Sequence, residues 1–181
     1  MPLTAAESSL VEQATTLARE QISPHAARWE RERRIGHEAL QAAVALGLTR
    51  LQLPVSGGGL DASFSCKAAV AEALAAGDFG FAMSWVNTHN VAAKLARDAA
   101  PHIAARYVPD LVAGRRLGCT ALTEPGAGSD FAAITTLATQ VDGGWRIEGA
   151  KAWITNAAEA DVGGLYGPAP PGRGGRGGAG L

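Results

Sequence analysis

The spacing of the apolar residues changes once along this chain, near Leu117. Before that point apolar side chains recur at helical spacing, which predicts an all-helical domain over residues 1–116. After it, threonine and β-branched residues gather in 135–141 and the residues of 145–148 alternate, which is typical of strands. We therefore expect an α+β fold, in which the helical domain is followed by a partial antiparallel, barrel-like β domain over residues 117–162.

Capping and turn residues divide the helical part. Thr4 and Glu7 are spaced as a capping box at the start of the first helix. Pro101 and Pro109 each predict the start of a short helix, because proline has no N–H to lose in a first turn. Gly47 is placed to end a helix. The predicted helices in between cover residues 37–46, 64–76 and 79–97.

The β part contains one hairpin signal and one further strand signal. Asp142-Gly143-Gly144 lies between two strand-like runs and predicts a tight turn. Residues 151–155 predict another strand, on which Trp153 and Thr155 share a face because side chains alternate.

The end of the chain has a different composition. Sixteen of the 19 residues from Gly163 to Leu181 are Gly, Pro, Ala or Arg, which predicts a disordered tail over 163–181. The codons of these residue types are rich in G and C. We therefore hypothesise a shifted reading frame near Val162, which the downstream nucleotides test by encoding or not encoding a continued strand pattern in another frame.

Charge, cysteines and hydropathy exclude several classes of protein. The formal net charge is -1, which gives no general attraction to nucleic acid or to an anionic membrane. Cys66, Cys119 and the four histidines are scattered and show no metal-ligand spacing, so we expect free thiols and no metal. The N-terminus shows no signal-peptide pattern, and no run approaches the ~20 apolar residues of a membrane helix. We expect a cytoplasmic protein.

Two motifs carry the chemical information. Residues 120–130 (TALTEPGAGSD) run from a strand into a Pro-Gly turn and a Gly-Ser pair, whose N–H groups and hydroxyls suit phosphate or ring heteroatoms. Residues 151–156 (KAWITN) place an indole beside a hydroxyl, which could cover a flat aromatic ligand and bond its edge. Taken singly, the first is also explained as an ordinary turn and the second as a core tryptophan.

Together, the two motifs closely resemble the flavin-binding signature of the acyl-CoA dehydrogenase family. The resemblance covers about residues 5–162, including the stretches 39–55 and 105–114. It implies an N-terminal helical domain, a middle β domain and a C-terminal helical bundle, and the bundle is absent from this chain. It also implies an FAD bound between the β domain and the bundle, usually in a homotetramer.

The resemblance gives the first motif a role on the flavin. Leu122 and Thr123 would contact the pyrimidine side of the isoalloxazine, and Ala121 precedes them in the expected cofactor-binding set. Gly128 and Ser129 would meet the pyrophosphate. Ser129 would also lie near the acyl-CoA substrate.

Trp153 and Thr155 of the second motif would flank the flavin ring, with Thr155 near N5. Ile154 between them belongs to the same expected cofactor-binding set. In such enzymes of fatty acid metabolism a carboxylate removes the α proton of the thioester while hydride leaves the β carbon for the flavin. Electrons then pass to an electron-transfer flavoprotein. Because that carboxylate lies in the absent bundle, we assign no catalytic residue, and we expect Glu124 to be structural.

Three alternatives remain open. The chain could be an inactive, truncated remnant, because a β domain of few strands leaves open edges. The Arg-Gly-Gly tract at 172–178 could bind single-stranded RNA, although two arginines in a neutral chain make a weak site. Acyl-CoA oxidases and flavin monooxygenases share the scaffold, and the residues that distinguish them lie outside this chain.

Two further features have simple structural interpretations. His89 stands among apolar helix residues and is expected to be a hydrogen-bonded core histidine rather than a catalytic base. The charged run Arg28–Arg34 is expected to be a solvated helix face.

Overall fold

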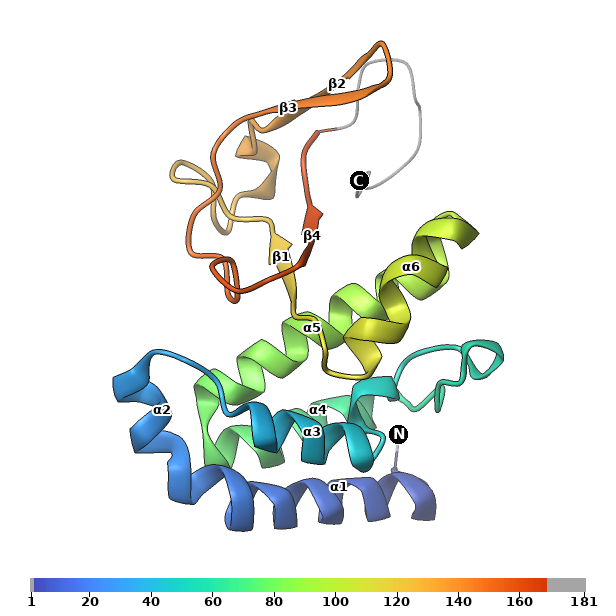
Figure 1. Ribbon diagram of the computed structural model, residues 1–181, viewed down its shortest axis with the longest axis vertical. Coiled ribbons are helices and arrows are strands. Elements are labelled where there is room, and N and C mark those ends of the chain that lie inside the picture. Colours follow the sequence, from blue (N-terminus) through green and yellow to red (C-terminus); the bar gives the residue numbers. More distant parts are fainter. Residues whose placement is uncertain (1, 169–181) are drawn as a thin grey trace.

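The computed structural model describes residues 2–168, and the helices and the strands occupy different ends of it (Figure 1). The described part holds six α-helices, followed by four strands. The helices are α1 Ala5–Leu17, α2 Ala26–Glu32, α3 His37–Ala45, α4 Phe64–Gly77, α5 Phe79–Asp98 and α6 Pro101–Val112. The expected helices over 37–46, 64–76 and 79–97 are therefore confirmed to within a residue at each end, and Gly47 follows α3 with a φ of 76°.

The two prolines do not start two helices. Pro101 opens α6 as expected, but Pro109 lies inside the same helix, so the prediction of two short helices is wrong. A proline keeps a helical φ and removes one backbone hydrogen bond. The next turn carries Leu111, which is 1% exposed and packs with Val91 of α5 and with Leu53. Burial of that leucine explains why the helix continues past Pro109.

The helical core is built around α5, which packs against α4, α6 and the first strand. Trp85 and Phe81 of α5 are almost fully buried, and the Phe81 ring stacks on Trp29 with ring centroids 6.1 Å apart. The large buried side chains of the same cluster are Leu17, Ile22, Leu40, Leu48, Leu51, Val70 and Leu74.

His89 is the core histidine that the sequence predicts. It is 2% exposed, its Nε2 accepts the N–H of Gln52 at 3.2 Å, and its ring lies 5.5 Å from that of Trp85. Burial, and then the positive charges of Lys67 and Arg97, lower the pKa of His89 to about 3. The imidazole is therefore neutral across the physiological range.

The capping box of α1 also ties α1 to α4. The Glu7 carboxylate accepts the N–H of Thr4 at 2.9 Å and the N–H of Ser63, the N-cap residue of α4, at 2.8 Å. Hydrogen bonds from Ser63 and Thr4 lower the pKa of Glu7 to about 2.

Replacing Glu7 by glutamine is expected to lower the melting temperature, because a neutral amide accepts these hydrogen bonds more weakly. The folded pKa lies below the ordinary value of 4.5, so the stabilisation is complete above pH 4.5 and is lost as the pH falls towards 2. Thermal unfolding followed by circular dichroism should show the gap between wild type and variant closing over that range. The exposed neighbour Glu12→Gln is the matched control, and a gap that stays constant with pH contradicts the prediction.

The four strands form two separate pairs. They are β1 Gly118–Ala121, β2 Leu137–Val141, β3 Gly144–Glu148 and β4 Val162–Leu165. The expected hairpin is confirmed: β2 and β3 are antiparallel, with Val141 opposite Gly144. β1 and β4 are instead parallel, with Gly118 opposite Val162, a pairing that local sequence does not predict.

β4 also corrects the predicted start of the tail. Residues 163–165 belong to a strand, so the expectation of disorder from Gly163 onwards is wrong there. Two of the four residues of β4 are glycines, which disfavour strands, and pairing with β1 overrides that preference. The rest of the predicted tail from 169 onwards, including the Arg-Gly-Gly tract, lies outside the described residues.

Residues 151–155 do not form the predicted strand. A single backbone bond, from the N–H of Ala152 to the carbonyl of Thr123 at 3.0 Å, holds them to their neighbour. Trp153 and Asn156 have φ of 58° and 68°, in the left-handed region that breaks an extended ladder. Trp153 and Thr155 therefore do not share a strand face.

Other expectations concern charges, thiols and membranes. The run from Arg28 to Arg34 is exposed except for the buried Trp29, which confirms a solvated face. Cys66 and Cys119 are free thiols, the first buried and the second half-buried. Within residues 2–168 there is no group of His, Cys, Asp and Glu that could hold a metal, and no helix there is long and apolar enough to cross a membrane.

Candidate functional site

The segment that follows β1 presents unpaired hydrogen-bond donors. Leu122 and Thr123 are half-buried, and within the described residues neither their N–H groups nor the Thr123 hydroxyl meets a protein acceptor. Their carbonyls are occupied: Lys151 Nζ donates to Leu122 at 2.9 Å, and Ala152 N donates to Thr123 at 3.0 Å. One edge of this segment is thus closed by protein, and the other offers two N–H groups and one hydroxyl.

A buried ion pair holds this arrangement together. Lys151 Nζ lies 2.9 Å from Glu124 Oε1, and the two side chains are 10% and 5% exposed. Nζ also donates to the carbonyls of Leu122 at 2.9 Å and Tyr166 at 2.7 Å, so its three N–H groups have three acceptors. One ammonium group thereby connects the first motif, the second motif and the residue that follows β4.

The Glu124 carboxylate also accepts hydrogen bonds from two threonines. It accepts the N–H and hydroxyl of Thr135 and the N–H of Thr136, each at 2.8 Å. Hydrogen bonds from Thr136 and Thr135, together with the Lys151 ammonium, hold the pKa of Glu124 far below its usual range. A carboxylate so strongly held is a poor proton acceptor, which supports the structural role expected for it.

The Pro-Gly turn closes on itself and then exposes a second set of donors. Glu124 N donates to Ala127 O at 2.9 Å, and Ala127 N returns a bond at 3.1 Å. Gly128 and Ser129 follow in an exposed bend, and their N–H groups meet no protein acceptor in residues 2–168. Successive free N–H groups beside a hydroxyl are chemically suited to phosphate oxygens.

Trp153 is the most exposed large apolar side chain of the described chain, at 92%. Its φ of 58° is unusual for a bulky residue, and strained backbone of this kind gathers at functional sites. The segment is anchored beyond it by Asn156, whose Nδ2 donates to the carbonyls of Gly118 at 3.0 Å and Ser84 at 3.2 Å. The indole is thereby presented outward from a fixed base.

The structure brings most of the expected site residues together, though not all. Leu122 and Thr123 lie beside the start of the second motif through the bonds of Lys151 and Ala152. Ala121 ends β1, and its carbonyl accepts the N–H of Tyr166 at 3.1 Å. Within the described chain, Gly128 and Ser129 share no hydrogen bond with residues 151–156.

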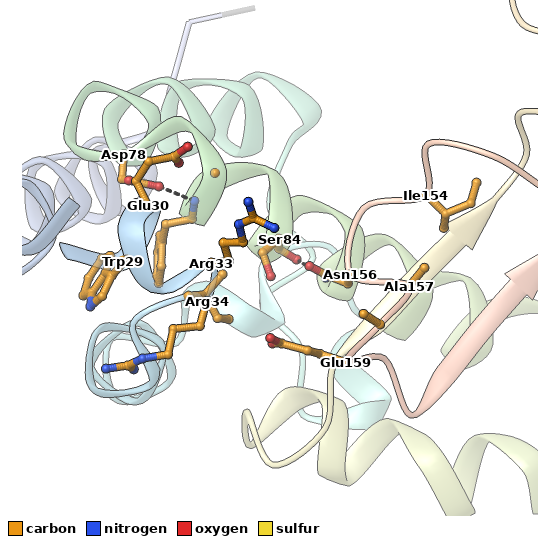
Figure 2. Close-up of a pocket in the computed structure, with 14 residues that line it drawn as sticks. Trp29, Glu30, Arg33, Arg34, Asp78, Ser84, Ile154, Asn156, Ala157 and Glu159 are labelled. Carbon is orange, nitrogen blue, oxygen red and sulfur yellow. Dashed lines mark hydrogen bonds between the residues drawn. The ribbon is translucent and has the colours of Figure 1, made fainter. Parts of the chain in front are cut away.

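Ile154 and Thr155 differ in their surroundings. Both are half-buried, and Ile154 lines a cleft of about 440 Å³ between the second motif and the helical domain (Figure 2). The helical wall of that cleft comes from the end of α2 and the start of α5.

Sequence reasoning missed the anchoring roles of Lys151 and Asn156. The available signal was a lysine in one motif and a glutamate in the other, both among apolar and glycine-rich neighbours. Charged side chains are almost never fully buried unless they are paired. A lysine and a glutamate in such surroundings therefore indicate an ion pair between the two motifs.

The donor set fits an isoalloxazine and its pyrophosphate. Two adjacent N–H groups and a hydroxyl suit the carbonyl and nitrogen acceptors of a pyrimidine edge, and an outward indole suits a flat ring. The carboxylate of the nearby Glu124 is engaged by Thr135 and Lys151.

Two family models match the chain. The acyl-CoA dehydrogenase N-terminal domain matches residues 4–115, and the acyl-CoA dehydrogenase middle domain matches residues 119–174.

Curated relatives are similar over most of this chain. A mitochondrial short/branched chain specific acyl-CoA dehydrogenase of Rattus norvegicus is 33% identical over 146 residues, which cover 80% of this chain and 34% of the relative. A (2S)-methylsuccinyl-CoA dehydrogenase of Cereibacter sphaeroides is 30% identical over 152 residues, covering 83% of this chain and 28% of the relative. The chain thus spans about a third of the length of these relatives.

Solved structures agree in fold. The FAD complex of PigA superimposes with a TM-score of 0.82 at 28% identity, covering 94% of this chain and 45% of that one. A glutaryl-CoA dehydrogenase from Mycobacterium smegmatis gives a TM-score of 0.77 at 30% identity, covering 91% and 43%.

Proposed function

Because the chain belongs to the acyl-CoA dehydrogenase family, we propose that it binds FAD and supplies the flavin-binding part of an oxidoreductase acting on acyl-CoA thioesters. The observation that carries this proposal is the adjacency of the two motifs. The free donors of Leu122 and Thr123 lie beside the segment that presents Trp153, and the Lys151–Glu124 pair holds the two together.

Each motif residue has a proposed task. The N–H groups of Leu122 and Thr123 donate to the pyrimidine edge of the isoalloxazine, and Trp153 covers the ring. Thr155 lies near N5. These assignments use donors that the protein itself leaves unpaired.

The phosphate end of the cofactor has its own donors. Gly128 and Ser129 offer N–H groups and a hydroxyl to the pyrophosphate, and Ser129 also faces the acyl-CoA substrate. Support for this assignment comes from their exposure and from the turn that holds them in one bend.

The chemistry divides between cofactor and protein. Bound FAD supplies a hydride acceptor for the β carbon of the thioester. The residues of this chain bind and orient the ring, and Glu124, held ionised by Lys151 and Thr135, takes no part in proton transfer. We assign the α-proton acceptor to none of the described carboxylates, and we propose an electron-transfer flavoprotein as electron acceptor and a homo-oligomer as the assembly of the full-length protein.

Trp153→Ala is expected to weaken FAD binding about fivefold, because the loss of an aromatic stacking surface costs about 1 kcal/mol. The measurement is titration of the purified chain with FAD, followed by flavin fluorescence and by retention of flavin colour after gel filtration. Trp145→Ala is the matched control, since Trp145 is also an exposed indole, at 43%, but lies on β3, outside the second motif.

The outcomes separate the proposal from its alternatives. A folded chain that remains colourless contradicts FAD binding and favours a protein without flavin function. Equal losses in Trp153→Ala and Trp145→Ala contradict the assigned ring position while leaving flavin binding itself intact.

A further inference from the structure

The peptide group of Gly118, at the start of β1, is held on both of its sides by protein. Its N–H donates to the hydroxyl oxygen of Thr88 at 3.1 Å, and its carbonyl accepts Nδ2 of Asn156 at 3.0 Å. Thr88 belongs to α5 and is 3% exposed, and Gly118 is buried as well. We call these two contacts the Gly118 junction. A buried peptide group that loses such a partner stays desolvated, so each of the two bonds matters for the position of β1.

Asn156 extends the Gly118 junction to a second point on α5. Its Nδ2 also donates to the carbonyl of Ser84 at 3.2 Å, and Figure 2 shows the two residues side by side. Ser84 precedes Thr88 by about one helical turn, so both residues lie on the same face of α5. One face of this helix therefore holds β1 through Thr88 and the second motif through Ser84.

The glycine at position 118 lets the strand lie directly against α5. A Cβ atom there would come within 2.9 Å of Val91 Cβ and 3.2 Å of Thr88 Cα, both of which belong to α5. Only a residue without a side chain allows the two backbones to approach so closely. Close packing of this kind leaves the Gly118 peptide little room to shift, so it is a fixed point relative to the helix.

The two flavin motifs are connected at both of their ends. At one end Ala152 N donates to Thr123 O at 3.0 Å, and at the other Asn156 holds Gly118. Between these connections the backbone has left-handed φ values of 58° at Trp153 and 68° at Asn156. Such conformations persist only where the surrounding bonds fix them. Loss of the Gly118 junction should therefore let the indole move relative to the donors of the first motif.

We propose that Thr88 and Asn156 are positioning residues for the isoalloxazine. Through the Gly118 junction they fix the two motifs against α5 and against each other, so that the helical domain contributes to flavin binding through β1. The inference rests on the FAD binding proposed above. It adds Thr88, a residue that lies outside both motifs, to the set on which the flavin depends.

The test is a titration of the whole chain with FAD, in which Thr88 is replaced by two different residues. Valine has nearly the shape of threonine but cannot accept the N–H of Gly118, so Thr88→Val is expected to weaken FAD binding about fivefold. Thr88→Ser keeps the hydroxyl oxygen and should bind FAD within about twofold of wild type.

Thr49→Val is the matched control. Thr49 is also a buried threonine, at 4% exposure, and its hydroxyl donates to the carbonyl of Val112 in α6 at 2.7 Å. This bond joins two segments of the helical domain and includes neither motif. Thr49→Val should therefore lower the melting temperature, as Thr88→Val does, but leave the affinity for FAD unchanged.

The visible circular dichroism of the bound flavin distinguishes positioning from stability. A ring in altered surroundings changes this spectrum, whereas a fold that is only less stable leaves it unchanged well below the melting temperature. Asn156→Gly removes the two side-chain bonds, and glycine accepts the left-handed φ of this position without strain. Thr88→Val and Asn156→Gly should alter the spectrum, and Thr49→Val should not. Because both variants act through one peptide, the loss of affinity in the double variant should be smaller than the product of the single losses.

The results separate this inference from the function on which it rests. A wild-type chain that binds no FAD overturns the proposed function and the inference with it. If the wild type binds FAD and Thr88→Val leaves both the affinity and the flavin spectrum unchanged, the positioning role alone is overturned. Equal losses of affinity in Thr88→Val and Thr49→Val would also overturn it, since they would show a general effect of stability.

Discussion

Lys151→Met is expected to lower the melting temperature by about 10 °C and to abolish retention of FAD. The variant leaves the Glu124 carboxylate buried without its cation, and it frees the carbonyls of Leu122 and Tyr166, which lie 2.9 and 2.7 Å from Nζ. Removing one partner of a buried ion pair is far more costly than removing an exposed one, because the remaining charge stays desolvated. Circular dichroism and flavin titration measure the two effects.

The matched control is Lys94→Met. Lys94 pairs with Asp98 at 3.0 Å, but these side chains are 41% and 60% exposed, so the loss should be small. In the double variant Lys151→Met/Glu124→Gln, part of the lost stability should return because the unpaired charge is gone, while FAD retention should not return. Equal effects of Lys151→Met and Lys94→Met would show that the buried pair does not organise the site.

Acidification from pH 6.5 to 4.5 is expected to cost the fold about 2 kcal/mol through His89 alone. The unfolded imidazole binds a proton below its ordinary pKa of 6.5, while the folded one stays neutral down to about 3. A lowered folded pKa means that this stability is fully present above pH 6.5 and is lost as the pH falls. Glu7, with its ordinary value at 4.5, loses its contribution mainly below this window.

His89→Gln provides the measurement. An amide oxygen can still accept the N–H of Gln52, which lies 3.2 Å from Nε2, but it does not titrate. Denaturant unfolding at several pH values should therefore give a steeper loss of stability for wild type than for His89→Gln between pH 6.5 and 4.5. If the stabilities of wild type and variant fall with pH in parallel, the buried imidazole does not control the loss of stability between pH 6.5 and 4.5.

Local features of the sequence were sufficient for the parts of the fold that local interactions decide. The α1 capping box at Thr4 and Glu7, the end of α3 at Gly47 and the β2–β3 hairpin at Asp142-Gly143 are each set by residues a few positions apart. The paired motifs likewise indicated a flavin site, because their residue types, order and spacing are a property of the sequence alone.

The features that sequence did not predict depend on contacts between distant segments. The helix α6 continues past Pro109 because Leu111 in its next turn is buried, and the glycine-rich β4 is a strand because it pairs with β1. Lys151 holds its segment through side-chain bonds rather than a strand ladder. In these places the local propensity for the observed structure was weak or unfavourable. The free energy of burying apolar groups, or of pairing a buried charge, decided which structure formed.

What the sequence alone determined was the family, the succession of a helical part and a β part, and which residues carry donors. What only the tertiary structure decided was which donors remain free. The N–H groups of Leu122 and Thr123 are available because Lys151 and Ala152 occupy the opposite edge. A free hydrogen-bonding group is defined by the absence of a partner in space, and sequence spacing does not encode that absence.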